Sequence, residues 1–261
     1  MAPIEKMADN IVLVDETEVY EEMQPFISMI KKQHMDILNH AQMRQEFTAN
    51  VSHELKTPLT AISGYAELIA SGMTGGEDTV HFANEIHRSA ERLQSLINDI
   101  IKLSELDDSD LKLEFETVDL HELGEQCVSS MQMQAEKNEV TLQLEGTSVP
   151  MSGNKTLLEE LLFNLCSNAV RYNKKGGSVT IVTAIENTRP VLIVKDTGIG
   201  IPKEQQERVF ERFYRVDKSR SKSTGGTGLG LAIVKHIVAQ HDAQISMTSE
   251  VGVGTEIKVV F

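Results

Sequence analysis

The chain has 261 residues, which suits one or two domains, and 40% of them are apolar, enough for a buried core. Its 25 basic and 39 acidic side chains give a formal net charge of −14, which argues against a nucleic-acid-binding surface. No apolar run approaches the ~20 residues of a membrane span, and the N-terminal residues do not have the pattern of a signal peptide, so we expect a soluble protein or the cytoplasmic part of a larger one. The two cysteines, Cys127 and Cys166, lack ligand or redox spacing, which indicates reduced thiols in an intracellular protein.

The first part of the sequence predicts a helical hairpin. A helical pattern runs over about residues 19–70, a glycine-rich turn follows at 71–79, and a second helix is expected over 78–106. Its apolar stripe has the alternating steps of four and three that are typical of a bundle seam: Phe82, Ile86, Ser89, Leu93, Leu96, Ile100 and Leu103. One hairpin cannot bury this stripe alone. We therefore expect a homodimeric four-helix bundle; the alternative is that the hairpin packs on its own C-terminal domain.

The first helix carries a histidine in the stretch FTANVSHELKTPLT, residues 47–60. An imidazole is a nucleophile at cell pH, and the carboxylate of Glu54 can hold one ring proton of His53 while the other nitrogen attacks. Thr57 lies one turn further on the same face, and Pro58 should bend the helix. His53 lies off the stripe that we expect to be buried, which consists of Phe47, Val51, Leu55, Leu59 and Ile62. Taken alone, such a histidine is more often part of a solvated helix face.

The second part of the sequence predicts an α+β domain. Strands are expected over 111–115, 140–144, 179–185, 191–196, 245–249 and 255–261, and helices over 120–137, 155–172 and 229–240. Between 198 and 228 the backbone should be irregular, and a loop of this length inside a compact domain is usually functional.

Three stretches of this second part together indicate a nucleotide site. Asn164 and Asn168 are four residues apart, so both amides project from one helix face, and an amide oxygen suits Mg²⁺. The carboxylate of Asp196, in DTGIG, can accept a hydrogen bond from an amine such as that of adenine, and its glycines allow close backbone approach. GGTGLGL, residues 225–231, leads into a helix and can offer backbone amides to phosphates.

With these motifs in this order, the chain resembles the catalytic core of a sensor histidine kinase of a two-component system, of the phosphate-sensor-like kind, over about residues 45–261. SHELKTPLT resembles the phosphoacceptor motif, NLCSNAVRYN the asparagine motif, DTGIG and GTGLGL the two glycine motifs, FERFYR the phenylalanine motif, and GVGT the closing adenine-side motif. Arg171 and Asn173 depart slightly from the family pattern, in which lysine and threonine or serine are common.

The resemblance implies a role for each of these residues. His53 would accept the γ-phosphoryl group of ATP with Glu54 as its base, Asn168 would bind Mg²⁺, and Thr57 would serve a regulator phosphatase activity. The implied nucleotide-binding set is Asn164, Asn168, Arg171, Tyr172, Asp196, Gly198, Gly200, Arg215, Gly226, Thr227, Gly228, Leu229, Gly230 and Thr255. Among these, Asp196 would bind the adenine amine, Arg171 and Tyr172 the phosphate side, and Arg215 the γ-phosphate. The superfamily's ATP hydrolases carry a water-activating glutamate where this chain has Asn164, and an amide cannot take a proton at neutral pH.

The implied fold is α+β: an antiparallel helical hairpin that forms a dimeric four-helix bundle, followed by an α/β-sandwich ATP-binding domain of the gyrase, histidine kinase and MutL type. The expected divisions are a signalling segment at 1–44, the dimerisation and phosphotransfer domain at 45–107, a linker at 108–116 and the ATP-binding domain at 117–261. The expected activity is autophosphorylation of His53 and transfer to an aspartate of a response-regulator receiver domain, on the cytoplasmic side of a membrane that the protein reaches only through segments absent here. The alternatives are a catalytically silent, ATP-binding dimeric scaffold and a gyrase-type ATPase.

Overall fold

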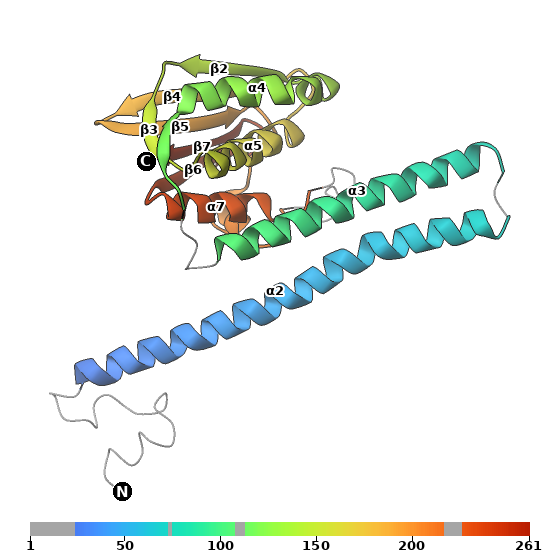
Figure 1. Ribbon diagram of the computed structural model, residues 1–261, viewed down its shortest axis with the longest axis horizontal. Coiled ribbons are helices and arrows are strands. Elements are labelled where there is room, and N and C mark those ends of the chain that lie inside the picture. The colour runs from blue at the N-terminus through green and yellow to red at the C-terminus, as the bar shows by residue number, and fades with distance from the viewer. Residues whose placement is uncertain (1–23, 73–74, 108–112, 217–225) are drawn as a thin grey trace, which may run out of the picture. The chain divides into compact units, whose positions relative to one another are not determined.

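A computed structural model of the chain describes residues 24–72, 75–107, 113–216 and 226–261 (Figure 1). These residues fall into two compact units that divide between Thr57 and Pro58, inside the long helix α2 (Gln24–Ala70). Residues 19–23, where the sequence pattern places the start of this helix, lie outside the described ranges. No helix in the described part of the chain has both the length and the apolar character needed to cross a membrane.

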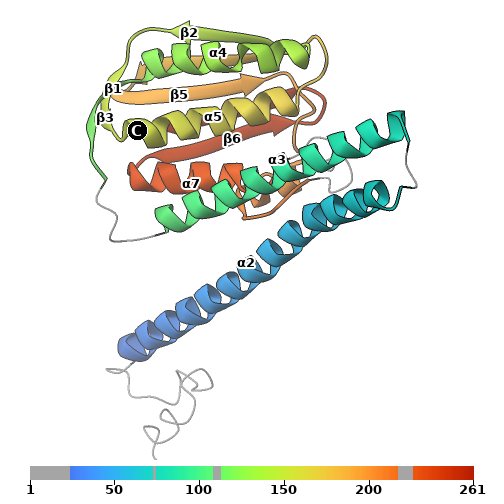
Figure 2. The ribbon, with the colours of Figure 1, turned by 45° about the vertical axis from the view of Figure 1, so that its right-hand side comes forward.

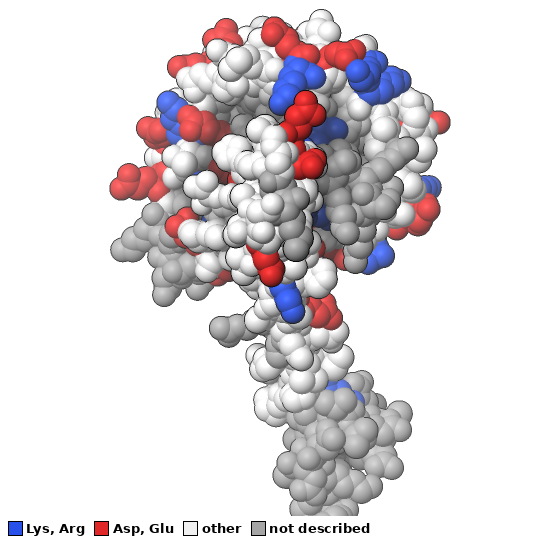
Figure 3. Space-filling model, turned by 90° about the vertical axis from the view of Figure 1, so that its right-hand side faces the viewer, with Lys and Arg blue, Asp and Glu red and all other residues white. Residues whose placement is uncertain are grey.

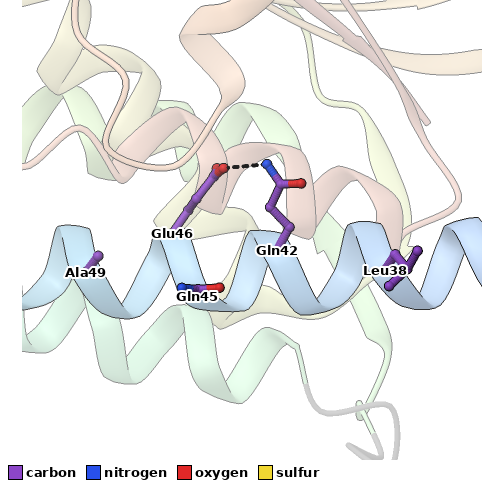
Figure 4. A pocket seen from close by; sticks show the side chains of 5 residues that line it. All are labelled: Leu38, Gln42, Gln45, Glu46 and Ala49. Atoms are coloured by element: carbon purple, nitrogen blue, oxygen red, sulfur yellow. Dashed lines mark hydrogen bonds between the residues drawn. The ribbon is translucent and has the colours of Figure 1, made fainter.

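The first unit consists of α2 as far as Thr57. Phe47, Val51 and Leu55 are half-buried, as expected. Further towards the N-terminus, Gln42 Nε2 donates to Glu46 Oε1 at 2.8 Å, one turn along the helix (Figure 4). Among the described residues, Leu38, Gln42, Gln45, Glu46 and Ala49 of α2 line a surface pocket in this region.

One position of the expected buried stripe is wrong, because Leu59 is 57% exposed while its neighbour Pro58 is buried. The physical reason is the spacing of the stripe. Phe47, Val51, Leu55 and Leu59 are separated by steps of four, and each such step turns about 40° past a full helical turn. Three steps therefore carry Leu59 about 120° away from the direction of Phe47. The bend expected at Pro58 stays a prediction; the helix continues through it.

The second unit begins with the end of α2 and with α3 (Glu77–Leu106), which form the expected hairpin. Gly76 supplies the turn with a φ of 53°, which suits glycine. The ring of Tyr65 on α2 stacks on that of Phe82 on α3 with centroids 5.3 Å apart. The predicted seam of α3 is the less exposed face of the helix, and Leu96 and Leu103 are buried. Figures 1 and 2 both show α3 running alongside α7 (Gly230–Gln240).

The rest of the second unit is a two-layer α/β domain. Its five-stranded sheet has the order β2 (Thr141–Gly146), β4 (Ser178–Glu186), β5 (Arg189–Asp196), β7 (Gly254–Val260) and β6 (Gln244–Glu250). Only the β2–β4 pair is parallel among these neighbours. The helices α4 (Leu120–Lys137), α5 (Lys155–Arg171) and α7 form a layer against this sheet, as Figure 2 shows. The fold class expected from the sequence is confirmed in this helical part and this mixed sheet.

The helix layer and the sheet enclose the core through an alternation that the sequence already shows. Val179, Ile181 and Thr183 of β4 are buried, while the residues between them are half-exposed. On α5, nine residues are buried and the polar Asn164 and Asn168 are not. Acidic and basic side chains are interspersed on the face in Figure 3.

The strand expected over 111–115 is wrong in place: residues 113–115 are not in a strand, and 111–112 lie outside the described ranges. The strand is instead β1 (Glu116–Asp119), paired antiparallel with β3 (Pro150–Gly153), which the sequence did not predict. Only Val118 of β1 is buried, and β3 begins with a proline. The position of this strand is therefore decided by its pairing with a segment distant in sequence, and the apolar alternation at 111–115 does not predict it.

Candidate functional site

His53 lies on the exposed side of α2, with 80% of its side chain accessible. Its Nδ1 is 3.7 Å from Glu54 Oε1, beyond hydrogen-bond length but close enough that a small rotation would join the two groups. An exposed imidazole beside a carboxylate can present its other nitrogen to an incoming phosphoryl group. The structure thus places an exposed imidazole next to a carboxylate, and the phosphoacceptor role of His53 stays a prediction.

Thr57 lies one turn after His53, and its hydroxyl donates to the carbonyl oxygen of His53 at 3.2 Å. This back-bond is common for threonine inside a helix. It uses the hydroxyl proton, whereas the oxygen keeps lone pairs that can accept a hydrogen bond from water. The side chain is exposed, on the same face as the histidine.

In the second unit, α5 presents the two asparagines next to the start of α7. The helix is capped by Asn154, whose Oδ1 accepts from Leu157 N at 3.0 Å. Asn164 Nδ2 donates to the backbone oxygen and to Oε1 of Glu160, both at 2.9 Å. A Cβ at Gly230 would lie 2.7 Å from Asn164 Oδ1 and 3.7 Å from Asn168 Nδ2. Because glycine has no side chain, the start of α7 can approach the two asparagines of α5 closely.

Asp196 ends β5 and is held through one of its two carboxylate oxygens. Oδ1 accepts from Gly198 N at 2.8 Å and from Thr255 N at 3.2 Å. Burial raises the pKa of Asp196 above its ordinary value, and the two backbone bonds act against that rise. Because both bonds fall on Oδ1, Oδ2 is the oxygen that can accept from a ligand amine.

Glycines around Asp196 allow backbones to approach closely. A Cβ at Gly254 would lie 2.0 Å from the Asp196 carbonyl oxygen, and one at Gly200 would lie 2.0 Å from that of Glu250. Both glycines have positive φ, 142° and 68°, so another residue would be strained there as well as crowded. DTGIG and GVGT are thus packed backbone to backbone.

The second glycine motif forms the opposite side of the site. Leu229 is fully buried, and α7 begins directly after it at Gly230, with no side-chain cap on its first amides. Gly228 has a φ of 77°, and its carbonyl oxygen accepts from Phe213 N at 2.9 Å. A Cβ on Gly228 would lie 3.3 Å from Arg215 Cγ, so Arg215 packs against this motif.

Arg171 and Tyr172, at the end of α5, meet the same motif at Gly226. A Cβ on Gly226 would lie 2.9 Å from an Arg171 guanidinium nitrogen and 3.2 Å from the Tyr172 hydroxyl. Tyr172 also contacts the DTGIG motif, because Ile199 N donates to its carbonyl oxygen at 3.1 Å. The predicted nucleotide-binding residues in the described ranges therefore form one connected group around two glycine motifs and α5; Gly225 lies outside those ranges.

Sequence reasoning assigned no role to three residues that shape this site. Asn173 Nδ2 donates to Ser178 O at 3.0 Å and joins the end of α5 to the start of β4. Glu160 orients Asn164, and its i,i+4 spacing was a usable signal. Asp99 on α3 accepts from Thr227 Oγ1 at 2.6 Å, and no local pattern in the sequence predicts that contact.

Comparisons with known proteins identify the two parts. Residues 43–109 match the His Kinase A (phospho-acceptor) domain, and residues 153–261 match the histidine kinase-, DNA gyrase B- and HSP90-like ATPase family. The chain is 39% identical to the sensor-like histidine kinase SenX3 of Mycolicibacterium smegmatis over 224 residues, which are 84% of this chain and 58% of the relative. This chain belongs to the sensor histidine kinases.

Solved histidine kinases share its fold. Full-length ShkA in complex with AMPPNP aligns with a TM-score of 0.61 and 27% identity, covering 82% of this chain and 45% of that one. Histidine kinase ThkA in complex with the response regulator TrrA aligns with a TM-score of 0.69 at 22% identity, covering 93% of this chain and 67% of that one. The chain spans about half the length of the curated sensor kinases that it matches.

The residues of this histidine kinase fit a magnesium ion shared with a nucleotide. In the described ranges, no three His, Cys, Asp or Glu side chains stand close enough to hold a metal as a group. Mg²⁺ bound with a nucleotide needs few protein ligands, because phosphates and waters complete its shell. The half-buried amide of Asn168, beside the space that Gly230 leaves, is a suitable oxygen ligand.

Proposed function

We propose that this chain uses ATP to phosphorylate His53 and then passes the phosphoryl group to an aspartate of a response-regulator receiver domain. The observation that carries the proposal is that Asn164 and Asn168, Asp196 and the 226–230 motif lie together in one unit, while the chain also holds an exposed histidine beside a carboxylate. A nucleotide site alone would suit an ATPase. The histidine provides the acceptor that an ATPase lacks.

In the proposed reaction, one imidazole nitrogen of His53 attacks the γ-phosphorus of ATP. The bond from that phosphorus to the β,γ-bridging oxygen breaks, ADP leaves, and Glu54 takes the imidazole proton. Asn168 would hold the magnesium ion, which supplies neutralisation of the phosphate charge. Asp196 would select the adenine amine, and Arg171 and Arg215 would face the phosphates. The second transfer moves the phosphoryl group from the imidazole to a carboxylate oxygen of the regulator.

Asn164 supports transfer to histidine over hydrolysis. Its Nδ2 donates hydrogen bonds to Glu160, so its Oδ1 is the atom that faces the second glycine motif. An amide oxygen cannot act as a general base for water at neutral pH. ATP bound here is therefore spared from hydrolysis until an acceptor histidine reaches it. No feature of the site favours the catalytically silent scaffold.

We also infer a homodimer through residues 45–107 and a position on the cytoplasmic side of a membrane, in a longer protein with a sensor. The domain limits and the phosphate-sensor-like subfamily stay predictions. The dimer is supported by apolar side chains of the hairpin that stay exposed in the single chain, among them Val80, Ile97 and Ile101.

Incubation with γ-labelled ATP and Mg²⁺, followed by acid or alkali, tests the reaction. A phosphohistidine label is lost in acid and kept in alkali, unlike phosphoserine. His53→Gln should carry no label and should bind ATP as the wild type does. His87, which is also exposed beside a glutamate, Glu91 at 3.3 Å, provides the matched control, because His87→Gln should be labelled normally. Label at wild-type level in His53→Gln would refute the assignment.

A further inference from the structure

The helix α3 contacts the candidate nucleotide site at two points, one turn apart. Asp99 Oδ2 accepts from the hydroxyl of Thr227, in the second glycine motif, at 2.6 Å. Lys102 Nζ lies 3.4 Å from Glu160 Oε2, and the other oxygen of Glu160 accepts from Asn164. One face of α3 therefore contacts the second glycine motif through Asp99 and the helix α5 through Lys102.

Asp99 has the surroundings of a bound anion. Its carboxylate is half-buried, and burial raises its pKa above the ordinary value, to which the negative charge of Glu160 adds; the Thr227 hydroxyl bond and the charge of Arg171 act in the opposite direction and favour the ionised form. Arg171 and Thr227 are brought together at Gly226, which the Arg171 guanidinium approaches. A hydroxyl donor, a guanidinium and a glycine motif form a set that suits a phosphate group.

We propose that Asp99 is an internal anion that holds the phosphate side of the nucleotide site and that the phosphates of ATP must displace. The inference rests on the proposed function, because it concerns the regulation of that site. Two negative groups cannot share Thr227 and Arg171 without strong repulsion. Nucleotide binding and the Asp99–Thr227 contact therefore exclude each other. By linkage, docking of α3 weakens ATP binding, and ATP loosens the docking of α3 by the same factor.

A second group of contacts holds α3 without using the nucleotide-binding residues. Arg212 Nη2 donates to both oxygens of Asp107, at 2.7 and 2.9 Å, and Gln240 Nε2 donates to Leu106 O at 3.3 Å. Asp107 is eight residues beyond Asp99, about 12 Å along the helix. Its replacement weakens docking without removing the anion, so the two effects can be separated.

The test is calorimetric titration of the whole chain with ATP and Mg²⁺. Asp99→Asn keeps the shape of the side chain and removes its charge, and Asp99→Ala removes the contact with Thr227 as well. Both variants should bind ATP about 5-fold tighter or more, the lower end of common coupling between sites. Adenosine, which has no phosphate, should bind equally to all proteins. Asp107→Asn, which loosens docking but leaves Asp99 in place, should gain less ATP affinity than either Asp99 variant, and the exposed α3 variant Glu105→Gln should bind ATP within about 2-fold of the wild type.

Unchanged ATP affinity in both Asp99 variants, with ATP bound by the wild type, would overturn the inference and leave the proposed function intact. An equal gain with adenosine, or in Asp107→Asn, would also overturn it, because release of α3 in general would then be the cause. An equal gain in Glu105→Gln would assign the effect to long-range charge instead. No ATP binding by any of the proteins would overturn the proposed function and, with it, the inference.

Discussion

At the scale of the residue, Asp196 shows how one carboxylate can be fixed by the fold and still serve a ligand. Its Oδ1 accepts both backbone bonds, from Gly198 and Thr255, and its Oδ2 would remain for the proposed bond to the adenine amine. In Asp196→Asn the amide oxygen can keep both backbone bonds, because an NH₂ group facing two N–H donors would be repelled. The other amide atom is then a donor that meets the donor of adenine.

We therefore expect Asp196→Asn to lose about 2 kcal/mol or more of ATP binding, roughly 30-fold, the magnitude of a hydrogen bond to a charged group. Its thermal stability should not fall, because burial raises the pKa of Asp196 and the ionised carboxylate is therefore costly in the folded state. Calorimetry with ATP and Mg²⁺, together with a melting curve, measures both. Near-normal ATP affinity would show that the adenine position is wrongly assigned.

Thr57 sets a second test at the residue scale, since its back-bond to His53 O and a role in holding water use different atoms of the hydroxyl. If the hydroxyl positions the water that attacks an aspartyl phosphate, Thr57→Ala should lower phosphatase activity about 10-fold or more. Autophosphorylation and transfer should stay within about 2-fold, because alanine is a good helix former and the back-bond adds little to helix stability.

The measurement is release of phosphate from a purified phospho-regulator, with Thr57→Ser as the matched control that keeps the hydroxyl. Equal rates for the wild type and Thr57→Ala would refute the positioning role. A parallel fall of all three activities would show that Thr57 acts through helix structure.

At the scale of the element, the sequence predicts the bounds of a helix well when one apolar period persists over many residues. The helix expected over 78–106 is α3 (Glu77–Leu106), and the one expected over 120–137 is α4 (Leu120–Lys137). The four-residue strands β1 and β3 are too short for a period, and each becomes a strand by pairing with a segment some 30 residues away. The predicted nucleotide-binding residues lie in motifs that the sequence shows. The contact of Asp99 with Thr227 joins two elements that are distant in sequence, and no local pattern predicts it.

The junction of α5 and α7 provides a pH prediction at this scale. His241, just after α7, accepts from the backbone N–H of Asn154 through Nε2 at 3.1 Å, and its Nδ1 is 2.8 Å from Ile237 O. These partners require a neutral ring that is protonated on Nδ1 alone. Burial lowers the pKa of His241 below its ordinary value of 6.5, and the bond to Ile237 acts in the opposite direction.

Because the folded-state pKa is depressed, the unfolded chain binds more protons as the pH falls below about 6.5, and stability decreases through that window. The full contribution of the neutral ring is present above pH 6.5. His241→Gln keeps an acceptor but does not titrate, so its melting temperature should change less between pH 7.5 and 5 than that of the wild type. His236, whose pKa burial also lowers, adds the same sign of pH dependence to both proteins. Parallel melting curves for the two proteins would contradict the prediction.

At the scale of the whole molecule, the proposed phosphorylation, the proposed nucleotide binding and the docking of α3 belong to elements of one chain. The helix that carries the predicted dimer seam also carries Asp99 and Asp107, which contact the ATP-binding domain. Two expectations were alternatives in the sequence, dimerisation of the hairpin and packing of the hairpin on its own C-terminal domain. The seam residues Leu96 and Leu103, three before and four after Asp99, are already buried in the single chain, so only the part of α3 that faces away from Asp99 stays open to a second copy. Ile97 lies two residues before Asp99, and residues two apart do not share a helix face.

This separation makes the dimer testable. Ile97 and Ile101 are 42% and 52% exposed in the single chain, one turn apart, beside the seam residues Leu96 and Ile100. Ile97→Glu would place a charge in the interface of the proposed four-helix bundle, and an unpaired buried charge is strongly unfavourable. We expect the wild type to be a dimer at micromolar concentration and Ile97→Glu to dissociate at least 10-fold more readily. Ser95→Glu, which adds the same charge two residues away at an exposed polar position, should remain dimeric. Light scattering after size-exclusion chromatography measures all three; a monomeric wild type, or equal dissociation of both variants, would refute a dimer through this face.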